Sequence, residues 1–231
     1  MLGMANEFAA GFDFNRIDFK HTNNSPFGGS SSVNPYAFDP GFFQSPNATV
    51  PAFSSVTNQY ALFAEDRLSL TDRWSLIAGV RQDEPSISNT NLITPATSFE
   101  KSFSATSWRV GTVYNPIKDL AVYGQYSVAV DPVSNLITLS FPNKDFQLST
   151  GKEVEVGVKQ SFWNGRGEWT LAGYQIVKNN LLARDPLNPT VTQQIGQQSS
   201  RGVEASLGLV LDHGWRIDAN TAWRRTRLTS R

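Results

Sequence analysis

Apolar and polar residues alternate at every second position along much of this chain, which is the pattern of a β-strand with two unlike faces. Between Arg73 and Asp83 the apolar positions are Trp74, Leu76, Ala78 and Val80. The same separation recurs in segments 153–159, 203–212 and 215–224, whereas Asp66 interrupts one apolar set. We predict nine strands, near residues 5–19, 58–70, 73–86, 103–115, 119–131, 151–163, 166–179, 194–211 and 214–228.

The connectors between these segments alternate in length. Tight connectors carry turn-forming Asn, Asp, Pro or Gly residues and fall at Thr71 to Asp72, Asn115 to Asp119, Asn164 to Gly165 and Asp212 to Gly214. Long connectors lie between them, from about His21 to Asn58, Glu84 to Ser102, Asp131 to Thr150 and Asn180 to Gln193. Outer-membrane barrels have short periplasmic turns and long extracellular loops, so the pattern predicts an all-β, antiparallel transmembrane β-barrel.

The strand number indicates a part of a larger structure. Bacterial single-chain barrels close with an even number of strands, and an open sheet edge is not tolerated in hydrocarbon. We therefore expect residues 1–231 to be one consecutive slice of a larger barrel. Several segments exceed the ~9 to 11 residues that cross a bilayer, so we expect them to extend beyond it. Met1 to Gly11 lacks the pattern of an export signal, which predicts an incomplete N-terminus.

Composition narrows the function. The chain has no Cys, which excludes disulfides, thiolate metal sites and cysteine nucleophiles. Its 20 basic and 20 acidic residues give no basic footprint for nucleic acid. Hydrophobic residues make up 39% and mean hydropathy is −0.31, values that suit a barrel because only alternate strand positions face lipid.

Aromatic residues gather near the tight connectors. They are Trp74, Tyr114, Phe162, Trp163 and Trp215. We predict that they form the periplasmic-side aromatic girdle of a barrel in contact with outer-membrane lipid, whereas Trp223 and Tyr60 lie toward the opposite strand ends. The alternative is a β-sandwich, in which aromatics near turns plug the ends of the core.

A set of short motifs resembles TonB-dependent siderophore receptors. The run from Tyr60 to Arg81 resembles the family stretch "YAQD…L.DRW.L..G.RYD". The segments beginning at Arg109, Leu120, Gly151 and Ser199 resemble "RVGLVYNP", "LSLYGSYS", "GKQYEVGVK" and "RSRGVE". The resemblance is strong over residues 55–231 and looser before them, at Gly11, Asp13, Phe14 and Asn34 to Tyr36.

The resemblance implies a 22-stranded type of barrel that encloses an N-terminal plug. It implies uptake of ferric siderophores across the outer membrane of a Gram-negative bacterium, energised through TonB. The motifs match the barrel part only. We therefore expect this chain to lack the plug, the segment that contacts the energy-coupling protein and the closing strands. We expect a receptor that is not an enzyme and has no cofactor.

Arg81 is the charged candidate for a ligand contact. If the tight turns face the periplasm, the strand from Arg73 places Arg81 and Asp83 near the extracellular rim, on the face toward the lumen. Ferric siderophores are often anionic, and a guanidinium offers a planar set of donors to oxygen-rich anions. The alternative, which the polar lining of barrel interiors favours, is that Arg81 is solvated or paired with a lumen carboxylate.

The first long connector is the second candidate. It carries aromatic residues among Pro, Gly and Ser, namely Tyr36, Phe38, Phe42, Phe43 and Phe53. They are candidates for the apolar walls of a hydroxamate or catecholate site. Equally, the connector could fold back on the barrel and be packed by its own side chains.

Catalytic and metal sites find little support. His21 and His213 lie at opposite strand ends, so they cannot share a metal or triad site. Asp83 and Glu84 are adjacent and therefore point to opposite faces of a strand. Two other readings remain: a passive porin-like or enzymatic outer-membrane barrel, and a soluble β-sandwich that binds carbohydrate.

Overall fold

The computed structural model describes residues 4–23, 34–37, 48–131, 136–184, 188 and 192–229, and their strands form one antiparallel sheet. The strands are β1 (Ala5–Asn23), β2 (Val50–Thr71), β3 (Trp74–Asn91), β4 (Phe99–Ser102), β5 (Ala105–Ile117), β6 (Leu120–Asp131), β7 (Ser149–Phe162), β8 (Gly167–Arg184), β9 (Thr192–Val210) and β10 (Arg216–Thr229). Single 3₁₀ turns occur at η1 (Pro95–Thr97), η2 (Phe141–Asn143) and η3 (Asp212–Gly214). No helix in these ranges is long and apolar enough to cross a membrane.

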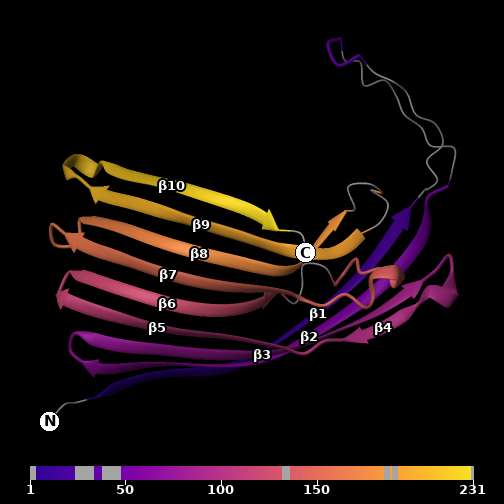
Figure 1. Cartoon of the computed structure of the whole chain (residues 1–231), viewed down its shortest axis with the longest axis horizontal. Coiled ribbons are helices and arrows are strands. Elements are labelled where there is room, and N and C mark those ends of the chain that lie inside the picture. Colours follow the sequence, from indigo (N-terminus) through magenta and orange to yellow (C-terminus); the bar gives the residue numbers. More distant parts are fainter. Residues whose placement is uncertain are drawn as a thin grey trace.

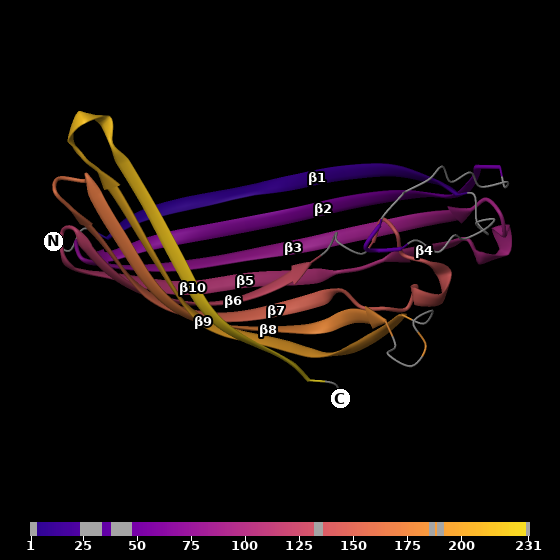
Figure 2. The same ribbon diagram turned by 90° about the horizontal axis from the view of Figure 1, so that it is seen from above.

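The strands lie side by side in chain order. The ladder runs β1-β2-β3-β5-β6-β7-β8-β9-β10, and β4 pairs with the far end of β3. Figure 1 shows the short connectors gathered at one end of the sheet, and Figure 2 shows the sheet curving from β1 round to β10. The fold class and all nine predicted strands are confirmed. The prediction missed β4, because four residues are too few to show a period.

The tight connectors have the backbone geometry that their residues suggest. Trp163 and Asn164 have φ values of 54° and 55°, and Gly165 follows with 83°. In the β9–β10 connection His213 and Gly214 have φ values of 63° and 79°. Asn and Gly tolerate this left-handed region, whereas Trp163 occupies it at a steric cost. The short connections are therefore confirmed.

The strands continue further into the long connectors than predicted. β2 begins at Val50 rather than near residue 58, and β3 ends at Asn91 rather than near residue 86. β8 continues to Arg184. The extra segment of β3, residues 87–91, reads Ile-Ser-Asn-Thr-Asn, a mostly polar composition typical of a loop. Its backbone nevertheless pairs with β2 and β4, because the hydrogen bonds between strands join backbone groups and can form whatever the side chains are.

The register aligns the polar positions of all the long strands on one face, called here the polar face. Its charged residues include Asp13, Glu65, Arg81, Arg109, Glu153, Glu155, Glu204 and Arg224. The opposite, apolar face carries Phe12, Leu62, Val80, Val110, Val156, Leu171, Leu207 and Ile217. Large apolar side chains stand exposed there, with Phe12 at 75% and Leu62 at 68%. An exposed apolar face of this extent requires lipid or a partner against it.

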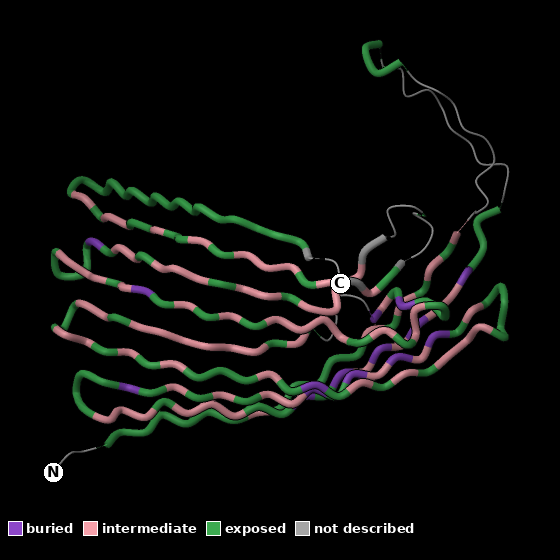
Figure 3. Tube along the Cα trace, viewed as in Figure 1, coloured by how far each residue is buried: buried purple, intermediate pink, exposed green. Residues whose placement is uncertain are grey.

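The small core lies on the polar face, at the end of the sheet where the long connectors lie. Ile87, Leu136 and Leu139 are buried together, with Phe99, Phe103 and Leu148 packed around them. The segment between β6 and β7 folds over β2 and β3, where Ser55 Oγ donates to the carbonyl of Ile137 at 2.9 Å and Asn89 Nδ2 to that of Leu139 at 3.3 Å. Figure 3 shows the buried residues concentrated at this end of β2 and β3.

Candidate ligand-binding site

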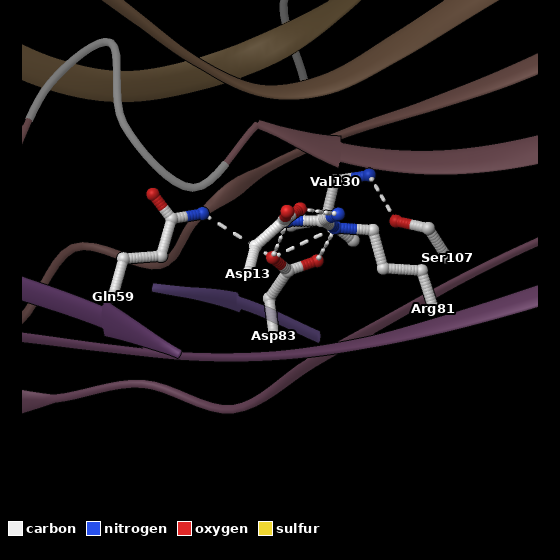
Figure 4. A network of polar contacts seen from close by, with 6 residues as sticks. All are labelled: Asp13, Gln59, Arg81, Asp83, Ser107 and Val130. Carbon is white, nitrogen blue, oxygen red and sulfur yellow. Dashed lines mark hydrogen bonds and ion pairs between the residues drawn. The ribbon is translucent and has the colours of Figure 1, made fainter. Parts of the chain in front are cut away.

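Arg81 lies at the centre of an ion-pair network on the polar face. Its guanidinium donates to Asp83 on the same strand at 3.0 Å and to Asp13 on β1. Gln59 Nε2 donates to Asp83 Oδ1 at 3.2 Å. These side chains converge in Figure 4, which also shows the backbone N–H of Val130 donating to Ser107 Oγ. The guanidinium donors are thus occupied by two carboxylates.

The register explains why Arg81 can reach Asp13 across a whole strand. Asp13, Ala61 and Asp83 stand opposite one another on β1, β2 and β3. Ala61, in the middle of this row, has only a methyl group, so the space above β2 is open to the long arginine side chain. The small residue between two carboxylates therefore determines the pairing.

A second ion pair repeats this arrangement nearby. Glu65, Gly79 and Arg109 stand in one row on β2, β3 and β5. Arg109 Nε and Nη2 donate to the two carboxylate oxygens of Glu65 at 2.7 and 2.6 Å, a bidentate geometry. A Cβ at Gly79 would lie 3.0 Å from Glu65 Oε2, so the glycine makes room for the pair.

An open hollow of about 460 Å³ lies over these networks. Its lining includes Asp13, Glu65, Arg81 and Arg109, with Phe63 and Ser107. The polar network places three carboxylates against two guanidiniums, so its formal charge is −1. The hollow therefore does not attract anions through excess positive charge. A ligand would have to replace an existing partner of an arginine.

The structure corrects the predicted height of Arg81. β3 continues beyond Asp83 to Asn91, so Arg81 lies near the middle of the strand and the expected position at the rim is wrong. Its pairing with carboxylates is the alternative left open by the sequence. The sequence did not identify Asp13, because the contact joins residues 68 positions apart through a register that spans two strands.

The aromatic candidates of the first long connector separate into three groups. Tyr36 is 97% exposed, and its backbone N–H donates to Asn34 Oδ1 at 2.9 Å. Phe53 belongs to β2 and packs against Phe19 and His21, at 5.9 and 5.1 Å between ring centroids, so its expected place on a loop is wrong. Phe38, Phe42 and Phe43 lie outside the described residues.

The aromatic residues near the tight connectors all lie at one end of the sheet. Trp74 and Tyr114 are register partners on β3 and β5, and Trp74 Nε1 donates to Thr112 Oγ1 at 2.7 Å. Phe162 and Trp163 form an edge-to-face pair with centroids 5.0 Å apart. Trp215 precedes β10 and is 70% exposed. This arrangement is compatible with a girdle at a membrane interface.

Nothing in the described ranges groups three or more His, Asp or Glu residues in a geometry that could hold a metal ion. His21 lies at the end of β1 and His213 in the β9–β10 turn.

Sequence comparison finds relatives that are named as receptors. The chain is 28% identical over 149 residues to the metal-pseudopaline receptor CntO of Pseudomonas aeruginosa. The aligned region covers 62% of this chain and 21% of that protein. It is 29% identical over 150 residues to the ferrioxamine B receptor of Salmonella typhimurium, covering 63% of this chain and 20% of the relative. The chain thus spans about a fifth of the length of these relatives.

Comparison with solved structures supports the fold. The closed form of the ferric-catecholate import receptor Fiu of E. coli superposes with a TM-score of 0.76 at 18% identity, over 98% of this chain and 36% of that one. A model of the family described as "TonB dependent receptor-like, beta-barrel" matches residues 1–230. The chain therefore belongs to the TonB-dependent receptor β-barrel family, whose members are proteins of the outer membrane of Gram-negative bacteria.

Proposed function

We propose that the protein is an outer-membrane receptor that binds ferric siderophores and imports them with energy supplied through TonB. The observation that carries the proposal is the charged polar face, with its hollow of about 460 Å³, on a sheet of this family. Relatives named as siderophore and metallophore receptors support the substrate class. This activity is transport, so it assigns no catalytic residue.

The 231 residues supply part of the barrel wall in this proposal. The sheet aligns with about a third of the solved relative Fiu, and β1 and β10 stand at its two edges. The polar face lines the lumen and the apolar face contacts lipid, as in other outer-membrane barrels. A plug domain, which the resemblance implies, fills the lumen in the full-length receptor and communicates with TonB.

Arg81 is the proposed polar contact with the ligand. Its side chain is 34% exposed and lines the hollow, and it reaches Asp13 across β2 over the buried Ala61. An oxygen-rich ferric siderophore replaces Asp13 as the partner, while Asp83, which is 2% exposed, keeps the guanidinium in place. Tyr36 is proposed as an apolar contact with the ligand, and Phe38, Phe42 and Phe43 are proposed with it from the sequence alone.

The test is binding of ferric siderophores to the purified full-length receptor, measured by quenching of tryptophan fluorescence. A hydroxamate complex, ferrioxamine B, and a catecholate complex serve as the probes. We expect saturable binding of at least one of them. Binding of neither complex would contradict the proposed function.

Arg81→Ala tests the ligand contact separately. We expect about tenfold weaker binding, the loss of roughly one charge-assisted hydrogen bond. Arg81→Lys keeps the charge without the planar fork and should recover part of the affinity. Arg16→Ala is the matched control, since it removes an arginine paired with Asp18 on the opposite face. Unchanged affinity in Arg81→Ala would remove Arg81 from the site and leave the receptor function standing.

A further inference from the structure

Three arginines stand together on the apolar face of β9 and β10. Arg201 and Arg225 are direct register partners, and Arg227 stands opposite Ser199. On the other side of β9, Gln175 of β8 faces Arg201. With Ser199 and Ser200 these residues line a hollow of about 120 Å³, enough for about four water molecules at ~30 Å³ each.

These guanidiniums have no counter-charge within the part of the chain that the structure describes. Six other arginines are paired with carboxylates within 4.0 Å, namely Arg16, Arg67, Arg81, Arg109, Arg166 and Arg216. Arg73 donates instead to the carbonyl of Pro116, and Arg224 stands singly on the polar face of the described sheet. Arg201, Arg225 and Arg227 form no such pair among the described residues. Like charges directly opposite each other on paired strands destabilise a sheet. The arrangement therefore calls for an anion.

Arg201 and Arg225 lie at the same distance along β9 and β10 from the tight turn that joins these strands. A tilted strand crosses a bilayer in ~9 to 11 residues. Arg225 is the tenth residue of β10, and Arg201 is the tenth residue of β9 counted back from its end at Val210. The cluster thus lies about one bilayer span from the tight-turn end, near the middle of β9 and short of the long connectors.

Trp223 marks the same boundary. It is 78% exposed and precedes Arg225 on the same face of β10. The apolar face carries Val203 directly opposite it, and Leu207 on β9 and Ile217 on β10 nearer the tight-turn end. An amphipathic tryptophan between an apolar band and basic side chains is typical of a membrane interface.

We propose that Arg201, Arg225 and Arg227 form a binding site for the phosphate group of a lipid in the outer leaflet. Arginine forks match phosphate oxygens geometrically, and the positive charge of three arginines more than balances that of one phosphate group. The Gln175 amide and the Ser199 hydroxyl are further donors in the hollow. The site opens on the lipid-facing side, and the apolar surface below it accommodates acyl chains, so a lipid rather than free phosphate is the ligand.

The test uses the full-length receptor in non-ionic detergent, with lipid binding counted by native mass spectrometry. The probes are short-chain phosphatidic acid, phosphatidylcholine of the same chain length and inorganic phosphate. We expect phosphatidic acid to bind about tenfold more tightly than phosphatidylcholine, and inorganic phosphate to compete weakly. The triple variant R201Q/R225Q/R227Q should lose this preference, a change of about tenfold or more.

Arg224→Gln is the matched control, because Arg224 lies on the same strand but on the polar face. It should leave the lipid preference within about twofold of the wild type. Arg225→Gln alone removes the directly opposed charge pair, so it should weaken phosphatidic acid binding severalfold without lowering the unfolding temperature.

Three results would overturn the site. The first is equal binding of phosphatidic acid by the wild type and the triple variant. The second is full competition by inorganic phosphate at the lipid's own concentration, which would indicate an anion site without lipid selectivity. The third is an equal loss in Arg224→Gln, which would indicate a general charge effect.

Discussion

At the scale of single residues, the polar face is organised by small side chains between large ones. Ala61 and Gly79 leave room for ion pairs that span a strand. Aromatic rings use glycines in the same way: Tyr123 lies over Gly157, and Tyr174 lies over Gly202. These pairs are direct register partners. Covering a glycine with a cross-strand aromatic protects the backbone and fixes the register.

Gly202→Ala tests this arrangement. A Cβ at Gly202 would lie 2.7 Å from the backbone carbonyl oxygen of Trp223 and 2.9 Å from Tyr174 Oη, so the strands must move apart. We expect a loss of roughly 1 to 3 kcal/mol, typical of overpacking, measured by urea unfolding of the full-length receptor in detergent.

Gly173→Ala is the control on the neighbouring strand, because its Cβ would meet only the carbonyl oxygen of Gly202, at 3.9 Å. Equal stability of the two variants would show that the close approach at Gly202 does not constrain the sheet.

The face of the sheet on which each polar residue lies could be predicted from the sequence, but its interaction partner could not. Period-2 alternation correctly placed Arg81 and Asp83 on one face. The choice of Asp13 as the second partner depends on two registers at once, β1 with β2 and β2 with β3. A shift of one residue in either register would break the contact between Arg81 and Asp13. The local sequence pattern does not determine either register.

At the scale of elements, the ends of β2 and β3 and the segment between β6 and β7 form one packed unit. Ile87 is 2% exposed and Leu139 6%. Polar composition made the ends of β2 and β3 resemble loops, because Ser and Asn are typical of connectors. The segment that covers them lies more than forty positions later in the chain, so its packing was not predictable from local sequence.

Leu139→Ala should release this segment. Removing a buried leucine side chain costs roughly 2 to 5 kcal/mol, here taken from local packing rather than from the whole barrel. We expect faster amide hydrogen exchange in residues 136–148, with the spanning parts of β7 to β9 unchanged.

Ile93→Ala gives the comparison, since Ile93 is a 63% exposed residue of the β3–β4 connection. Unchanged exchange in Leu139→Ala would mean that the segment is held by its hydrogen bonds from Ser55 and Asn89 rather than by apolar packing.

At the scale of the whole molecule, the sheet is one curved wall with different surroundings on its two faces (Figure 2). The alternation of tight and long connectors predicted this architecture correctly, since every tight connection joins neighbouring antiparallel strands. The apolar face is bounded by Trp74, Tyr114 and Trp215 at the tight-turn end and, about one bilayer span away, by Trp223 with its arginines. The aromatic and basic residues that form both boundaries can be read from the sequence. Their positions along the strands, relative to the tight turns, are known only from the structure.

Energised uptake by cells that express the full-length receptor tests whether the protein imports ferric siderophores actively. Cells are given a ferric siderophore that carries radioactive iron, with and without a protonophore that collapses the energy supply of the inner membrane. We expect iron to accumulate in energised cells and the protonophore to stop this accumulation. Accumulation that continues undiminished with the protonophore would contradict active import and indicate a passive pore.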